Sequence, residues 1–169
     1  GFEVISDACR DFGKTVYLTS GAIAGLDALK AVKDELESVV LVTTTNPNSL
    51  KGAPFFDSSD IDPEKISEPT VLFDGTAKEA VSLFPKNVNV SALLSLVGLG
   101  GNNTSVRVVA DPNTDKNTHE INANGKFGNL KITVENVPDS MNPKTSRLAT
   151  LSAVELLRQI CTKEVQIGT

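Results

Sequence analysis

Residues 110–134 read ADPNTDKNTHEINANGKFGNLKITV, and this stretch decides which kind of fold the chain adopts. It begins with turn-forming residues around Asp111-Pro112-Asn113, which indicate a surface loop. Apolar residues then recur as in two antiparallel strands, at Ile121, Phe127, Leu130, Ile132 and Val134. The dipeptide Asn124-Gly125 predicts a turn near it between these strands, because Asn-Gly is the strongest short signal of a hairpin.

His119 lies in this stretch and is the only histidine of the chain. Its ordinary pKa is close to neutrality, so it is the first candidate for proton transfer at physiological pH. Alternation along a strand places Asn117 and His119 on one side and Glu120 on the other. Asp111 or Asp115 of the preceding loop is therefore a candidate to orient the imidazole. A single histidine where a loop enters a sheet is more often structural than catalytic, and without a second histidine or cysteine nearby we expect no metal site.

The bulk composition predicts one globular domain. The chain has 169 residues, 40% hydrophobic and 22% charged, which is enough for one substantial core. A formal net charge of −5 without any lysine or arginine run argues against a nucleic-acid or membrane partner. Two cysteines without metal-ligand spacing and the lack of a long apolar run favour a reduced, cytoplasmic protein.

Outward from the hairpin, the sequence predicts alternating helices and strands. We expect strands at 15–19, 38–45, 71–73 and 106–110, and helices at 2–12, 20–36, 77–84, 88–97 and 146–161. The segment 46–69 is rich in Pro, Asp and Ser, and its length indicates a functional excursion or an insertion. This order predicts an α+β domain, a mixed β-sheet with helices packed mainly on one face.

Three predicted helix starts carry groups that can hold an anion. They are Ser20-Gly21-Ala22, the stretch from Lys86 to Asn89, and Lys144-Thr145-Ser146. Free backbone N–H groups and the helix dipole favour negative charge at such places, although ordinary capping explains each of them as well. Asn89 is the most specific of these residues, because a second asparagine after the Asn87 cap disfavours the helix. We expect it to be a buried amide that recognises another amide.

The chain has no dinucleotide-binding fingerprint. The run from Gly98 to Gly101, GLGG, follows a helix instead of a strand and lacks the third glycine, so we interpret it as the end of that helix.

Several segments together resemble the catalytic half of the L-aspartate dehydrogenase family. They are SGAIAGLDAL (20–29), FPKNVNV (84–90), ADP with NTHEI (110–121), GKFG (125–128) and NPKTSRLATLS (142–152), in the order and with the spacing found in that family. The resemblance covers nearly the whole chain. The difference from the family is at the N-terminal side, where the family has a Rossmann domain with a glycine-rich loop.

The resemblance implies the catalytic domain of a two-domain NAD(P)-dependent dehydrogenase. The implied reaction is oxidative deamination of L-aspartate to iminosuccinate, which hydrolyses to oxaloacetate and ammonia and in some organisms feeds NAD biosynthesis. It places the family's active-site histidine at His119 and its cofactor-contacting residues at Asn89 and Ala22. Donors for the dicarboxylate substrate are expected among the helix-start residues Ser20, Gly21, Lys86, Lys144 and Thr145.

The resemblance also makes residues 1–169 one catalytic and dimerisation domain of a homo-oligomer. We expect residues 1–13 and 146–169 to lie at the junction with the nucleotide-binding domain, and the 169 residues alone to be inactive. Two alternatives stay open. One is a non-catalytic dimerisation or ligand-binding module of the same fold, and the other is a related dehydrogenase for another small amino or keto acid.

Overall fold

The centre of the protein is a five-stranded mixed sheet. In the computed structural model, which describes residues 2–86, 89–140 and 145–162, the strand order is β2-β3-β1-β4-β5. The strands are β1 (Leu36–Thr45), β2 (Thr70–Thr76), β3 (Thr104–Ala110), β4 (Asn117–Gly125) and β5 (Gly128–Asn136). β1 and β3 run parallel and the other neighbours antiparallel, so the predicted mixed sheet is confirmed.

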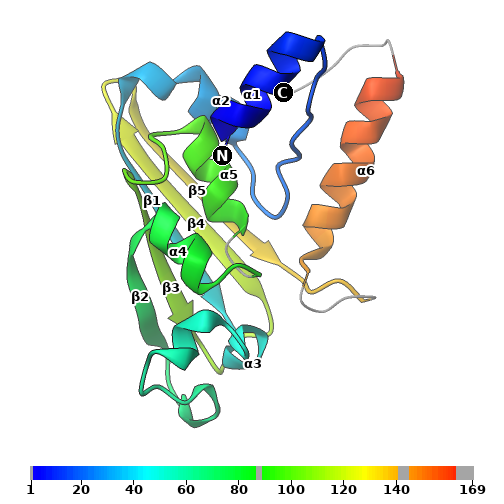
Figure 1. Ribbon diagram of the computed structural model, residues 1–169. Coiled ribbons are helices and arrows are strands. Elements are labelled where there is room, and N and C mark those ends of the chain that lie inside the picture. Colours follow the sequence, from blue (N-terminus) through cyan, green and yellow to red (C-terminus); the bar gives the residue numbers. More distant parts are fainter. Residues whose placement is uncertain (1, 87–88, 141–144, 163–169) are drawn as a thin grey trace.

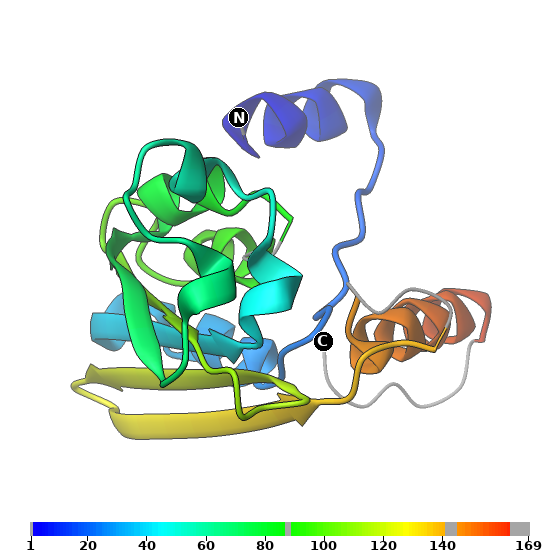
Figure 2. The same cartoon turned by 90° about the horizontal axis from the view of Figure 1, so that it is seen from below.

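The helices lie mainly on one face of this sheet, as predicted (Figures 1 and 2). They are α1 (Phe2–Phe12), α2 (Leu26–Ala31), α3 (Pro47–Leu50), α4 (Ala77–Leu83), α5 (Asn89–Val97) and α6 (Arg147–Cys161), with short 3₁₀ turns at Lys33–Glu35, Pro54–Asp57 and Pro63–Lys65. α4 and α5 pack on each other and on the sheet, whereas α1 and α6 stand apart from it (Figure 2).

The core lies between the sheet and the α4–α5 layer. β1 is the middle strand of the sheet, and its inward residues Val39 and Leu41 are buried in the core. Leu41 pairs with Ile121 of β4, which is also fully buried. Phe84 follows α4 and stacks on Phe55 with ring centroids 5.1 Å apart. The excursion 46–69 therefore contributes an aromatic ring to the core instead of merely connecting two strands.

The β4–β5 hairpin forms as predicted, and its turn directly follows Asn124-Gly125. Gly125 pairs with Gly128, so the two turn residues are Lys126 and Phe127. Gly125 is required for another reason, since a Cβ there would lie 2.0 Å from the carbonyl oxygen of Glu35. The positive φ of the turn, 116°, falls on Gly128. The glycine of the Asn-Gly pair thus serves a close backbone approach and not the turn.

The segment between α1 and β1 differs most from the sequence prediction. Residues 15–19 form no strand, and Tyr17 within them is 56% exposed, because this segment has no neighbouring strand with which to pair. Ser20 caps no helix: it lies in a turn closed by the Ile23 N–H to Ser20 carbonyl bond of 3.3 Å. α2 begins only after Gly25 and ends at Ala31, since Gly21 and Gly25 both adopt positive φ.

The remaining predicted helices are found close to their expected positions. α5 ends at Val97, and Gly100, with φ of 83°, donates to the carbonyl of Ser95, so the glycine run ends the helix as interpreted. Ser146 precedes α6 as its N-cap residue without a capping bond from its side chain. The predicted cap Asn87 lies outside the described residues. Within the described part, no helix is long and apolar enough to cross a membrane, and Cys9 and Cys161 are free.

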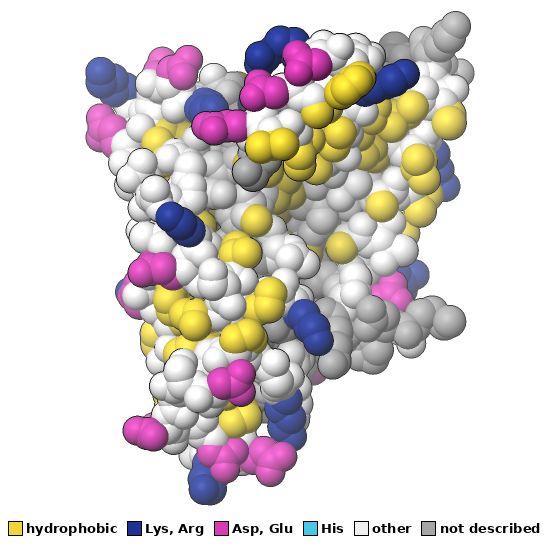
Figure 3. Space-filling view, viewed as in Figure 1, with side chains coloured by type: hydrophobic (Ala, Val, Ile, Leu, Met, Phe, Trp, Pro, Cys, Tyr) yellow, Lys and Arg dark blue, Asp and Glu magenta, His cyan; other side chains and the backbone are white. Residues whose placement is uncertain are grey.

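Exposed apolar side chains gather on α1, on the segment after it and on α6 (Figure 3). Phe12 of α1 is 75% exposed and Leu157 of α6 is 63% exposed. None of the residues of α6 is buried. These elements therefore present apolar surface that the described residues leave uncovered.

Candidate active site

One face of the β1–β4 strand pair changes from apolar to polar along its length. On β1 the inward residues Val39 and Leu41 are followed by Thr43 and Thr45, all of them buried. On β4, Ala123 and Ile121 lie opposite the apolar pair, and His119 lies opposite Thr43. The apolar end belongs to the core, and the polar end is the floor of a pocket.

Two cross-strand hydrogen bonds tie the polar end together. The Thr43 hydroxyl oxygen lies 3.2 Å from Nδ1 of His119, and Thr43 and His119 are 2% and 4% exposed. One step further along the strands, the hydroxyl of Thr45 donates to the side-chain carbonyl of Asn117. These bonds satisfy polar groups that burial would otherwise penalise.

Burial lowers the pKa of His119 from its ordinary value of 6.5 to about 4. Removal of the ring from water disfavours its charged form, and the hydrogen-bonding partner is a neutral threonine instead of a carboxylate. The imidazole is therefore neutral at physiological pH. A neutral imidazole can accept a proton at one nitrogen while the other nitrogen is held.

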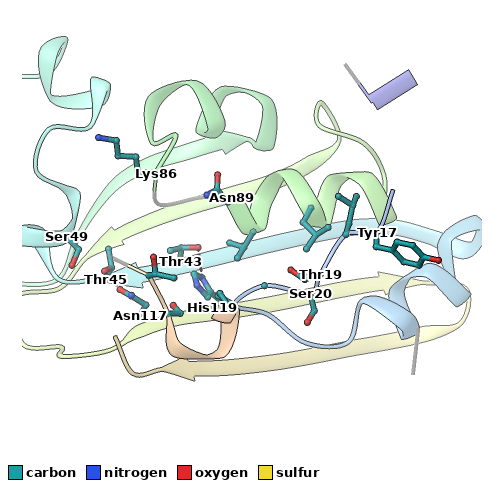
Figure 4. Close-up of a pocket in the computed structure, with 18 residues that line it drawn as sticks. Tyr17, Thr19, Ser20, Thr43, Thr45, Ser49, Lys86, Asn89, Asn117 and His119 are labelled. Atoms are coloured by element: carbon teal, nitrogen blue, oxygen red, sulfur yellow. Dashed lines mark hydrogen bonds between the residues drawn. The ribbon is translucent and has the colours of Figure 1, made fainter. Parts of the chain in front are cut away.

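The pocket above this floor has a volume of about 530 Å³, which is the size of a small-molecule site. Figure 4 shows Thr43, Thr45, Asn117 and His119 grouped on the strands, with Asn89 on the side of α5. The remaining walls come from the segment before α2 and from the start of α6.

Seven of the eight residues selected from the sequence line this single pocket. They are Ser20, Gly21, Ala22, Lys86, Asn89, His119 and Thr145. The eighth, Lys144, lies outside the described residues. Among the described lining residues, Lys86 is the one cation, and the others are mainly hydroxyl, amide or small apolar residues. The described residues hold no group of three or more His, Cys, Asp or Glu that could bind a metal ion.

The turn at residues 20–22 is held from two sides. Nδ2 of Asn136, at the end of β5, donates to the carbonyl of Ala22 at 2.9 Å. The hydroxyl of Ser152, on α6, lies 3.3 Å from the carbonyl of Gly21, to which it donates. Because the N–H of a peptide group points away from its C=O, the Gly21 bond turns the N–H of Ala22 away from Ser152. The turn is thus fixed by residues more than a hundred positions away in the chain.

Two expectations about individual side chains were wrong. Asn89 is exposed at the pocket instead of buried, because the start of α5 lies at the pocket and not in the core. The hydrogen-bonding partner of the imidazole is Thr43 and not a loop aspartate. Asp111 instead accepts a bond of 2.9 Å from the N–H of Asn113 within its own turn.

Sequence reasoning missed Thr43, Thr45 and Asn117 as pocket residues. A usable signal exists, because alternation along residues 38–45 places both threonines on the side of Val39 and Leu41. Polar residues at inward positions near the end of a central strand indicate that this end of the strand lines a functional pocket and not the apolar core.

Comparison with known proteins identifies relatives over almost the whole chain. Residues 27–160 match the family described as "Aspartate dehydrogenase, C-terminal". The L-aspartate dehydrogenase of Nitrosopumilus maritimus is 64% identical over 168 residues, which are 99% of this chain and 62% of that protein. The corresponding protein of Methanocella arvoryzae is 48% identical with the same coverage. The chain thus spans about 62% of the length of these relatives.

A solved structure agrees with these sequence matches. The crystal structure of aspartate dehydrogenase from Thermotoga maritima superposes with a TM-score of 0.70 at 30% sequence identity. The match covers 91% of this chain and 57% of that one.

Proposed function

Because this chain belongs to the aspartate dehydrogenase family, whose C-terminal domain it matches, we propose that it is the catalytic domain of an L-aspartate dehydrogenase. The proposed reaction converts L-aspartate to iminosuccinate, which hydrolyses to oxaloacetate and ammonia. The observation that carries the proposal is a buried, neutral His119 on the floor of a pocket that also gathers Asn89 and Ala22.

The pocket residues fit the nicotinamide end of NAD(P). Asn89 offers an exposed amide with both donor and acceptor, which matches the carboxamide of the nicotinamide ring. Ala22 offers a small side chain beside a turn that Asn136 and Ser152 hold. When bound, NAD(P) takes the hydride that leaves Cα of the amino acid. Asn89 would fix the ring face that receives it.

His119 would handle the proton of the reaction. The substrate amine loses a proton as it becomes an imine, and the water that attacks the imine loses one as well. A neutral imidazole can accept either proton, and burial keeps His119 neutral at physiological pH.

The walls offer donors for the two carboxylates of aspartate. Lys86 supplies positive charge, and Ser20, Gly21 and Thr145 lie at the same pocket. Lys144 remains a further candidate, adjacent to Thr145 in the sequence. In a chain of net charge −5, such a local set of donors is needed to attract a dicarboxylate.

The uncovered apolar surfaces of α1 and α6 support a two-domain arrangement. We expect these elements to contact an N-terminal nucleotide-binding domain that holds the rest of the dinucleotide, and the whole protein to be a cytoplasmic homo-oligomer. We also propose that the iminosuccinate formed by this reaction is used in NAD biosynthesis.

The test is aspartate oxidation by the full-length protein that carries this chain. NAD(P)H formation is followed spectrophotometrically with L-aspartate and with a panel of other small amino acids. The expected result is reduction of NAD(P) with L-aspartate and its loss in His119→Gln. Turnover of another amino acid in place of aspartate, or no turnover with any of them, contradicts the proposal.

A further inference from the structure

Thr43 is the partner through which the sheet holds the imidazole. Its hydroxyl oxygen lies 3.2 Å from Nδ1 of His119, and no other hydrogen bond of either side chain occurs among the described residues. Since His119 also lines the pocket, its second ring nitrogen, Nε2, is the one left for a ligand. On the basis of the function proposed above, we propose that Thr43 is a positioning residue that holds Nδ1 and directs Nε2 into the pocket.

The position of Thr43 is fixed by the backbone. β1 lies between β3 and β4, and Thr43 pairs with Val108 on one side and with His119 on the other. Both Thr43 and His119 are almost completely buried, so water has little access to Nδ1. The hydroxyl is therefore presented to the ring by the most constrained part of the sheet.

A hydroxyl suits this position because it can donate and accept. When the neutral ring carries its proton on Nδ1, that N–H donates to the Thr43 oxygen and the lone pair of Nε2 faces the pocket. When the proton is on Nε2, the Thr43 O–H turns and donates to Nδ1. A carboxylate or a backbone carbonyl would accept only, so it would hold a single tautomer.

The proton-transfer step balances without any proton leaving Thr43. An N–H bond of the substrate amine, or an O–H bond of the attacking water, breaks, and an N–H bond forms at Nε2. Nδ1–H donates to Thr43 before and after this step, so the ring does not need to turn. Thr43 thus keeps the imidazole in place in each of its protonation states.

The test uses three variants of the full-length enzyme. Thr43→Val keeps the shape of the side chain and removes the hydroxyl, and Thr43→Ser keeps the hydroxyl. Thr44→Val is the matched control, because Thr44 is the next residue of the same strand and points to the opposite face of the sheet.

We expect Thr43→Val to lower kcat by about 10- to 100-fold with little change in the KM for NAD(P), because a misoriented base loses most of its contribution. Thr43→Ser should stay within about threefold of the parent, and Thr44→Val should match it. Nitrogen NMR of the His119 ring should show altered Nδ1 and Nε2 signals in Thr43→Val.

A kcat of Thr43→Val equal to that of the parent overturns the proposal, and so does a Thr43→Ser variant as impaired as Thr43→Val. Unchanged ring-nitrogen signals in Thr43→Val overturn it too. Failure of the proposed function is a separate result, because the parent enzyme itself would then not oxidise L-aspartate, or His119→Gln would keep full activity.

Discussion

The side-chain amide of Asn136 donates a hydrogen bond of 2.9 Å to the carbonyl oxygen of Ala22, a residue 114 positions earlier in the chain. Asn136 is only 3% exposed, so water cannot replace this bond. The bond joins the end of β5 to the turn at one wall of the pocket, and it links the sheet to the place where the cofactor is proposed to bind.

Replacement of Asn136 by alanine should weaken the binding of NAD(P) to the full-length enzyme. One such hydrogen bond contributes about 0.5–1.5 kcal/mol, which corresponds to roughly a two- to tenfold rise in the dissociation constant if the turn shifts. Asn129→Ala is the matched control, since Asn129 lies exposed on the same strand. Fluorescence titration with NADH measures the difference, and equal affinities for the two variants would show that the turn does not depend on Asn136.

Replacement of His119 by glutamine should abolish most of the turnover without unfolding the protein. General acid–base catalysis contributes about 10²–10⁴-fold, and glutamine can still accept or donate a hydrogen bond to Thr43. Steady-state kinetics with aspartate measures the loss, and circular dichroism checks the fold. A variant that retains half of the activity would remove His119 from the reaction.

Stability should fall as the pH drops from 6.5 to 4. The unfolded chain binds a proton on His119 with a pKa near 6.5, whereas burial lowers the folded pKa to about 4. Between these values the unfolded state binds more protons, so acid favours unfolding. The loss of stability caused by His119 is absent well above pH 6.5, grows as the pH falls, and reaches roughly 3 kcal/mol at pH 4.

Urea unfolding at several pH values measures this effect. His119→Gln is the control, because glutamine does not titrate, and its unfolding free energy should decline less over the same interval. Parallel curves for the two proteins would mean that His119 is not the group responsible.

Replacement of Phe84 by alanine should lower the free energy of unfolding by about 3–5 kcal/mol, because Phe84 is fully buried and stacks on Phe55. Phe12→Ala is the control, since Phe12 is 75% exposed. Phe12→Ala should change the free energy of unfolding by no more than about 0.5 kcal/mol where no partner covers α1. Thermal unfolding of the 169-residue chain distinguishes the two, and similar losses would place Phe12 in a covered interface.

The 169-residue chain alone should produce little or no NADH from aspartate. Its pocket holds candidates for the nicotinamide end of the cofactor only, and the rest of the dinucleotide is expected to bind outside these residues. Addition of aspartate and NAD(P) to the isolated chain, with the full-length protein as control, tests this. Robust turnover by the isolated chain would contradict it.

Much of the sheet follows from the sequence alone, because alternation and β-branched residues specify strands such as β1 directly. The segment before α2 could not be predicted in the same way. Residues 15–19 have the composition of a strand, but a strand also needs a neighbour with free hydrogen-bonding groups, and no local pattern shows whether one is there.

The sequence predicts several residues of the pocket, but it does not predict the hydrogen bonds that hold them in place. His119 stands out in the sequence as the only histidine, and Asn89 and the 20–22 turn stand out as predicted helix starts. The family resemblance implies their roles, and the fold brings them to one cavity. The bonds from Thr43 to His119 and from Asn136 to Ala22 could not be predicted, because they join residues at least 76 positions apart. The first depends on the register of two strands, and the second depends on how a turn packs against the end of β5.

The division of the β1–β4 face into an apolar and a polar half has a consequence for how such a site can evolve. Thr43 and His119 sit on the same two strands as Leu41 and Ile121, so the backbone of the floor is held as firmly as that of the core. The walls come from a turn and from helix ends, which tolerate substitution. New substrate preferences can therefore arise by changes in the walls while the reactive floor is inherited intact.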